Sequence, residues 1–240
     1  MNGEKHEDKP VIGVLAWEGG GSQALAGLEA IPGNMLHPDT FDIPLRVVRV
    51  DGANYHTVVE RPDRRVLDGM IAASRAMAVE GIRAITTSCG FNAIFQKELA
   101  AAAPVPVFTS SLLQVPLAQA MIGNGRRVGI LTADSRCLTR AHLVGVGIDQ
   151  PEQLAIAGME ESREFTRALS DPEAVIDPEL FIGDIVAVAT RLRARHPDLG
   201  ALVLECTDLP PASEALRAEL GLPVFDILTL VNMVCRTVAA

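Results

Sequence analysis

The feature that most constrains the fold is a weak internal similarity between the two halves of the chain. Cys206 follows Cys89 by 117 residues, and at the same spacing the segment "PVF" at 106–108 recurs at 223–225. Repetition at such a long period indicates two copies of one structural unit. The sequence therefore predicts two similar halves, each with a cysteine at the same topological point.

Short apolar segments alternate with helix-like segments in both halves. The first half contains "VIGVLAW" (11–17) and "VPVFTS" (105–110), and the second contains "VGILTA" (128–133) and "ALVLE" (201–205). This alternation is typical of parallel sheets built from βαβ units. We predict an α/β fold with two pseudo-symmetric lobes, each a mainly parallel sheet flanked by helices, and an active site in the cleft between them.

The lobes can be assigned to continuous parts of the chain. We predict that 10–118 together with 225–240 form the first lobe and that 119–224 form the second, after a polar tail at 1–9. The 240 residues are enough for two lobes of ordinary size. Because only 4% of the residues are aromatic, Ala, Val, Leu and Ile must fill most of the core.

Charge and hydropathy narrow the class of partner. The net charge is −9 and there is no basic run, which argues against a nucleic acid. No stretch approaches the roughly 18 apolar residues of a membrane span, and the polar first ten residues lack the apolar part of a secretory signal. We expect a cytoplasmic protein with a small-molecule ligand, and the sequence is compatible with a homo-oligomer.

The residues that usually hold metals and cofactors are sparse. The four cysteines lie far apart without a Cys-x-x-Cys pair, and the five histidines show no metal spacing, so we expect free thiols and no metal. Pyridoxal phosphate would need a suitable lysine, whereas the three lysines lie in the polar tail or at a helical surface position. The glycine-rich segment at 19–24 is only a weak nucleotide fingerprint. We therefore expect no cofactor.

Cys89 and Cys206 each follow an apolar strand, at the end of a parallel sheet where ligands bind in open α/β folds. A free thiol has a pKa of about 8.5, and a helix N-terminus lowers it. One cysteine is thus expected to act as a thiolate base while the other acts as a thiol acid. Placed on opposite faces of a carbon atom, such a pair removes a proton from one side and returns one from the other.

The residues after each cysteine suit a carboxylate. Gly90 would let the main chain approach a ligand closely, and Thr207 offers a hydroxyl group. Backbone N–H groups at the start of a helix would stabilise the negative charge that develops on the substrate.

Four segments resemble the aspartate/glutamate racemase superfamily, which includes amino-acid racemases, hydantoin racemases, maleate isomerases and arylmalonate decarboxylases. They are "TSCGFNA" (87–93), "LECTDLPP" (204–211), "VLAWEGGGS" (14–22) and "RVGILTADS" (127–135), and the resemblance covers nearly the whole chain. It implies a cofactor-independent racemase or epimerase acting on a small carboxylate, and we expect an amino acid of the aspartate or glutamate type or a derivative. It implies Cys89 and Cys206 as the acid/base pair.

The resemblance also implies that Asn92 and Thr207 help to hold the carboxylate. This chain departs from the usual racemase pattern, in which Asn and Thr directly follow the first cysteine, because Gly90 and Phe91 intervene. Phe91 is expected to narrow the pocket and to favour a substrate other than glutamate. Two alternatives stay open: a maleate-type cis-trans isomerase that uses one cysteine as a nucleophile, and a non-catalytic protein that binds small acids.

Acidic and hydroxyl side chains near the strand ends extend the predicted site. Glu18, Glu205 and Asp208 would tune the thiols or bind an ammonium group, with Asp208 favoured. Ser22 would line the cleft beside the glycine segment, and Thr132 ends the strand that matches it. The complete set of predicted substrate-binding residues is Gly90, Phe91, Asn92, Thr207, Asp208, Glu18, Ser22 and Thr132.

Overall fold

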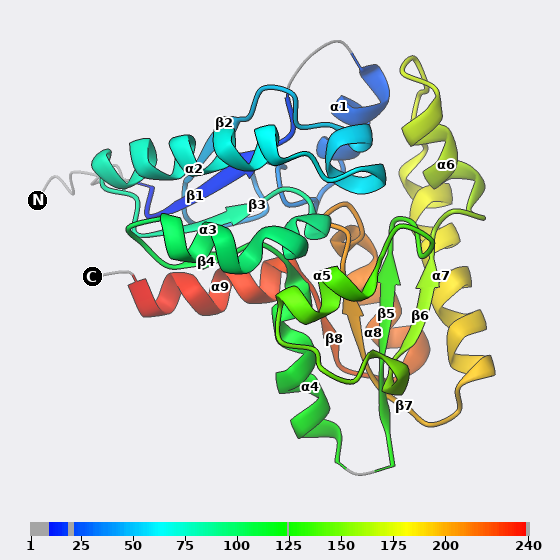
Figure 1. Cartoon of the computed structure of the whole chain (residues 1–240). Coiled ribbons are helices and arrows are strands. Elements are labelled where there is room, and N and C mark those ends of the chain that lie inside the picture. Colours follow the sequence, from blue (N-terminus) through cyan, green and yellow to red (C-terminus); the bar gives the residue numbers. More distant parts are fainter. Residues whose placement is uncertain (1–9, 19–21, 124, 239–240) are drawn as a thin grey trace, which may run out of the picture.

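The computed structural model describes residues 10–18, 22–123 and 125–238 and contains two four-stranded parallel sheets (Figure 1). The first sheet has the order β2-β1-β3-β4, and the second has the order β6-β5-β7-β8. The two orders are the same when the strands are counted within each lobe, so the predicted pair of similar α/β lobes is confirmed. The strands are β1 (Ile12–Ala16), β2 (Leu45–Arg49), β3 (Ala84–Thr87), β4 (Val107–Phe108), β5 (Arg127–Thr132), β6 (Ala155–Gly158), β7 (Leu199–Leu204) and β8 (Val224–Phe225).

The 117-residue spacing recurs in the hydrogen bonds. The N–H of Ile85 donates to the carbonyl of Pro106 at 2.9 Å, and the N–H of Leu202 donates to the carbonyl of Pro223 at 2.9 Å. These bonds join the third and fourth strands of each lobe. The weak similarity in sequence therefore reflects a real structural repeat.

A glycine in the first strand of each sheet lets a neighbour pack closely. A Cβ on Gly13 would lie 2.7 Å from Sδ of Met77, and one on Gly129 would lie 2.9 Å from Cδ2 of Leu199. Real Cβ contacts are longer, so a larger residue at either position would require the Met77 or Leu199 side chain to move.

Helices cover both faces of the first sheet. The helix α2 (Arg64–Val79) buries Val66, Met70 and Met77, and it begins where Asp63 accepts a hydrogen bond from Arg65 N–H. Apolar residues of α9 (Ile227–Val238) pack with Ile12 and Val14 of β1, so the last helix belongs to the first lobe. In Figure 1, α2 and α9 lie on opposite sides of this sheet.

The remaining helices surround the sheets and the junction between the lobes. Both predicted lobe boundaries fall inside elements, one within α4 and the other within β8. The α-helices not yet given are α1 (Gln23–Glu29), α3 (Gln96–Ala102), α4 (Val115–Ile122), α5 (Arg140–Gly145), α6 (Arg163–Ser170), α7 (Pro178–Arg195) and α8 (Ser213–Leu220). The shorter helices are η1 (Tyr55–Glu60), η2 (Gly90–Phe95), η3 (Ser111–Gln114), η4 (Pro151–Gln153) and η5 (Pro210–Ala212).

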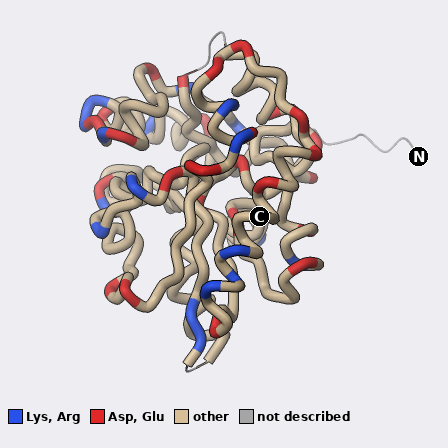
Figure 2. Tube along the Cα trace, turned by 90° about the vertical axis from the view of Figure 1, so that its right-hand side faces the viewer, with Lys and Arg blue, Asp and Glu red and all other residues tan. Residues whose placement is uncertain are grey.

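Acidic and basic residues are distributed along the chain in both lobes (Figure 2). Among the helices in the described part of the chain, none combines the length and apolar character needed to cross a bilayer.

Candidate active site

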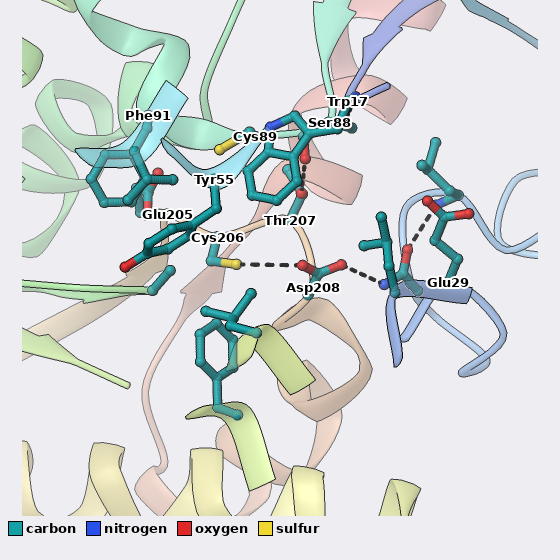
Figure 3. A pocket seen from close by; sticks show the side chains of 17 residues that line it. Trp17, Glu29, Tyr55, Ser88, Cys89, Phe91, Glu205, Cys206, Thr207 and Asp208 are labelled. Atoms are coloured by element: carbon teal, nitrogen blue, oxygen red, sulfur yellow. Dashed lines mark hydrogen bonds between the residues drawn. The ribbon is translucent and has the colours of Figure 1, made fainter. Parts of the chain in front are cut away.

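Cys89 and Cys206 line one cavity at the carboxyl ends of β3 and β7 (Figure 3). The N–H of Ser88 donates to Leu15 O at 2.9 Å, and the N–H of Glu205 donates to Leu131 O at 2.7 Å. These matched bonds place the two cysteines at equivalent points of the two lobes. The cavity is lined by Trp17, Leu25, Glu29, Asn34, Leu36, Tyr55, Val59, Ser88, Cys89, Phe91, Ala133, Phe165, Leu169, Glu205, Cys206, Thr207 and Asp208.

The structure corrects the expectation that one thiol rests as a thiolate. Burial raises the pKa of both Cys89 and Cys206 well above the ordinary value. The carboxyl groups of Glu205 and Asp208 raise both thiol pKa values further, while the N–H of Phe91 beside Cys89 acts in the opposite direction. The acids and the enclosure therefore outweigh the backbone donors, which favours the thiol form of both cysteines.

Asp208 is the polar neighbour of Cys206. The Cys206 thiol donates to Oδ2 of Asp208 at 3.9 Å, and Nδ2 of Asn34 donates to Oδ1 at 2.8 Å (Figure 3). Burial raises the pKa of Asp208 to about 6, while the bond from Asn34 acts in the opposite direction. At neutral pH this carboxylate is ionised and can accept the thiol proton.

Glu205 is fully buried between the two lobes. Its Oε2 accepts a hydrogen bond from Thr132 Oγ1 at 2.7 Å, whereas Oε1 has no partner among the described residues. Burial raises the pKa of Glu205 to about 7. Thr132 is not among the lining residues and reaches the site only through Glu205.

Gly90 has a different role from the predicted one. A Cβ at this position would lie 2.1 Å from the carbonyl oxygen of Glu205 and 2.3 Å from its Oε1. Gly90 thus lets the turn after Cys89 approach the turn before Cys206. It is not among the residues that line the cavity.

Three further predicted residues also lie outside the lining. Glu18 accepts hydrogen bonds from Gly52 N–H at 2.8 Å and Asn54 Nδ2 at 3.0 Å, and Ser22 caps α1 by accepting from Leu25 N–H. Asn92 is 1% exposed, and neither atom of its amide has a partner among the described residues. The glycines at 19–21 lie outside the described residues.

Thr207 lies at the cavity, but its hydroxyl proton is already engaged. Thr207 Oγ1 donates a short hydrogen bond to the carbonyl of Ser88. This bond joins the two cysteine-bearing turns across the lobes. Of the predicted set, Cys89, Phe91, Cys206, Thr207 and Asp208 line the cavity.

Aromatic residues that the sequence analysis did not select form much of the wall. Trp17 and Tyr55 are the single tryptophan and the single tyrosine of the chain, and Phe165 comes from α6. The Nε1 of Trp17 is buried and has no hydrogen-bond partner among the described residues. Its N–H nevertheless lowers the pKa of the Cys89 thiol. The rarity of Trp and Tyr in this chain was the signal that could have identified them.

The cavity is small and carries no cationic side chain. Four aromatic residues and three acidic residues line it, and no Lys, Arg or His is present among its described lining residues. Its volume of about 40 Å³ holds a few water molecules, since one water needs roughly 10–15 Å³. No cluster of potential metal ligands occurs in the described ranges.

Comparison with known sequences identifies related proteins. The model of the Asp/Glu/Hydantoin racemase family matches residues 45–232. A dimethylsulfoniopropionate lyase from Durusdinium sp. clade D is 31% identical over 212 residues, which cover 86% of this chain and 70% of that protein. Dimethylsulfoniopropionate lyase 5 from Emiliania huxleyi (strain CCMP1516) is 34% identical over 177 residues, covering 71% of this chain but 34% of that longer protein.

Solved structures share the fold at low identity. Allantoin racemase from Klebsiella pneumoniae has a TM-score of 0.64 at 19% identity, covering 95% of this chain and 88% of that chain. Unliganded arylmalonate decarboxylase has a TM-score of 0.56 at 18% identity, with 97% and 93% covered. The family match and the lyase relatives together show that the chain is an enzyme of the Asp/Glu/Hydantoin racemase family.

Proposed function

We propose that the protein is a lyase that eliminates dimethyl sulfide from dimethylsulfoniopropionate and leaves acrylate. The proposal is supported by the Durusdinium relative, which carries this activity in its name and is similar over most of both chains. The solved racemase and decarboxylase structures, at 14–19% identity, support the fold alone.

Elimination and racemisation share a first step. A base removes a proton from the carbon next to a carboxylate. In dimethylsulfoniopropionate the next carbon carries a sulfonium group. The electron pair of the broken C–H bond forms the new C=C bond, while the C–S bond breaks and its pair stays on sulfur. No oxidant or reductant is consumed.

The observation that carries the proposal is the asymmetry of the two cysteine turns. Two residues after Cys206 stands Asp208, which accepts a hydrogen bond from the thiol, whereas two residues after Cys89 stands Phe91. A racemase needs a proton carrier on each face of the carbon, but an elimination needs one base. We assign Cys206 as that base and Asp208 as the acceptor of its thiol proton.

The substrate itself supplies the change that ionises the thiol. Burial and the carboxyl groups of Glu205 and Asp208 raise the pKa of Cys206. A bound sulfonium cation offsets those negative charges and lowers the thiol pKa. We place the substrate carboxylate at the turns after Cys89 and Cys206, whose residues Phe91 and Thr207 line the cavity.

A second candidate function is favoured by one specific observation. Both thiols line the same cavity from equivalent points of the two lobes, as an acid/base pair requires. This arrangement supports racemisation of a small carboxylate, such as an amino acid of the aspartate or glutamate type, without a cofactor.

The test is incubation of the purified protein with dimethylsulfoniopropionate in D2O. We expect dimethyl sulfide in the headspace and an equal amount of acrylate by NMR. The Cys235→Ala variant is the control, since its thiol is buried in α9 away from the cavity. If neither product forms while chiral acids gain deuterium at their α-carbons, the racemase assignment replaces the lyase assignment.

A further inference from the structure

We infer that the cavity selects a small zwitterion by a permanently alkylated cation, a dimethylsulfonium or trimethylammonium group, placed beside Asp208. This inference rests on the proposed function for the identity of the substrate. It concerns binding alone, however, and is tested without turnover.

The charge of Asp208 favours a cationic ligand in this cavity. Of the three acidic residues at the cavity, Glu29 is paired with Arg49 at 2.9 Å. Asp208 receives its hydrogen bonds from neutral or weakly acidic groups, Asn34 and Cys206. No cationic side chain lines the described cavity, so the charge of Asp208 is uncompensated there. Such a charge favours a cationic ligand.

The carboxyl group of Glu205 provides a second, independent observation. Its side chain is fully buried and lines the cavity, and its Oε1 has no hydrogen-bond partner among the described residues. Buried carboxyl oxygens are normally satisfied by a donor or by a cation. A cation in the cavity would compensate Glu205 together with Asp208.

The aromatic wall distinguishes the kind of cation. Trp17, Tyr55 and Phe165 line the cavity, and the ring of Phe165 is held by stacking on Phe181 at 5.9 Å. Figure 3 shows the Trp17 and Tyr55 rings near the Cys206 thiol. An alkylated cation has no N–H to donate, and its methyl groups pack against ring faces that attract positive charge. A primary ammonium group that faced these rings would leave N–H groups without acceptors.

The same features disfavour ligands with two carboxylates. Aspartate, glutamate and maleate would each bring a second carboxylate into a cavity whose described lining holds Glu205 and Asp208 but no cation. Repulsion between like charges at short range opposes this binding.

A matched pair of unreactive ligands tests the inference. The zwitterion 3-(trimethylammonio)propionate and the neutral-tailed 4,4-dimethylpentanoate have the same shape and differ in one central atom, N⁺ against C. By isothermal titration calorimetry we expect the zwitterion to bind at least about tenfold more tightly, which corresponds to about 1.4 kcal/mol. Equal affinities would overturn the inference.

Variants locate the site. Asp208→Asn should weaken binding of the trimethylammonium ligand about tenfold. It should not weaken binding of the neutral-tailed ligand. Tyr55→Leu should weaken binding of the trimethylammonium ligand more than Tyr55→Phe does, because Tyr55→Phe keeps the ring. Glu60→Gln removes a carboxylate that does not line the cavity and should leave both affinities unchanged. If Glu60→Gln and Asp208→Asn weaken binding equally, the overall charge of the protein governs the affinity and the site beside Asp208 is refuted.

The outcomes separate the two proposals. Selective binding of the trimethylammonium ligand without release of dimethyl sulfide would support the cation site and reject the lyase. Release of dimethyl sulfide with equal binding of the two ligands would support the lyase and reject the cation site.

Discussion

The Cys206 thiol lies 3.9 Å from Oδ2 of Asp208, whereas the equivalent position after Cys89 holds the apolar side chain of Phe91. Two lobes with the same strand order therefore present chemically different thiols to one cavity. This difference allows the roles of the two cysteines to be separated by experiment.

Single cysteine variants should differ strongly. We expect Cys206→Ser to lower the elimination rate about 10²–10⁴-fold, the usual contribution of a general base. Cys89→Ser should lower it no more than about tenfold, because Cys89 has no carboxylate that takes its proton. Initial rates of dimethyl sulfide release measure both. Equal losses in the two variants would contradict the single-base scheme.

Asp208→Asn should change thiol reactivity and catalysis in opposite directions. Asp208 raises the pKa of Cys206, so its loss should lower that pKa and speed alkylation by iodoacetamide near neutral pH. Elimination should nevertheless slow, because the acceptor of the thiol proton is gone. Alkylation is followed by mass spectrometry of the Cys206 peptide. Slower alkylation in the variant would refute the assigned contact.

The same assignment predicts a pH dependence. Asp208 must be ionised to accept the proton, and burial raises its pKa to about 6. The elimination rate of the wild-type enzyme at low substrate concentration should therefore rise as the pH increases through about 6. Asp208→Asn should lose this step. A step that persists in the variant would assign the titration to another group.

Much of the fold and part of the site follow from the sequence because they depend on local patterns. The apolar strands, the repeated "PVF" segment and the cysteine after each third strand predict the two lobes and the position of Cys89 and Cys206. Asn34 could not be predicted, since it meets Asp208 across 174 residues of chain and comes from an irregular loop.

The role of Gly90 shows the same limit. Glycine after a catalytic cysteine suggests room for a ligand, but here the room is taken by Glu205. The approach of one turn to another is set by the packing of the two lobes, which has no counterpart in the local sequence.

Two glycine variants test this packing. Gly90→Ala should lower the free energy of unfolding by about 1–3 kcal/mol, because the new Cβ would overlap the Glu205 carbonyl. Gly183→Ala in α7 meets no atom within 4 Å and should raise it by up to about 1 kcal/mol. Urea unfolding followed by tryptophan fluorescence measures both. If Gly90→Ala leaves the free energy of unfolding unchanged, the two turns are free to separate.

Glu205 should make the protein less stable as the pH rises. Its pKa is 4.5 before burial and about 7 in the folded protein, so between these values the folded state binds more protons than the unfolded state. The contribution of Glu205 to the free energy of unfolding should therefore be largest below about pH 4.5. It should fall by at most about 3 kcal/mol as the pH rises through about 7. Glu205→Gln removes the titration and should flatten this part of the profile in urea unfolding between pH 5 and 8. A wild-type profile that rises across this range, with the Glu205→Gln profile parallel to it, would show that the Glu205 carboxyl does not titrate as a buried acid.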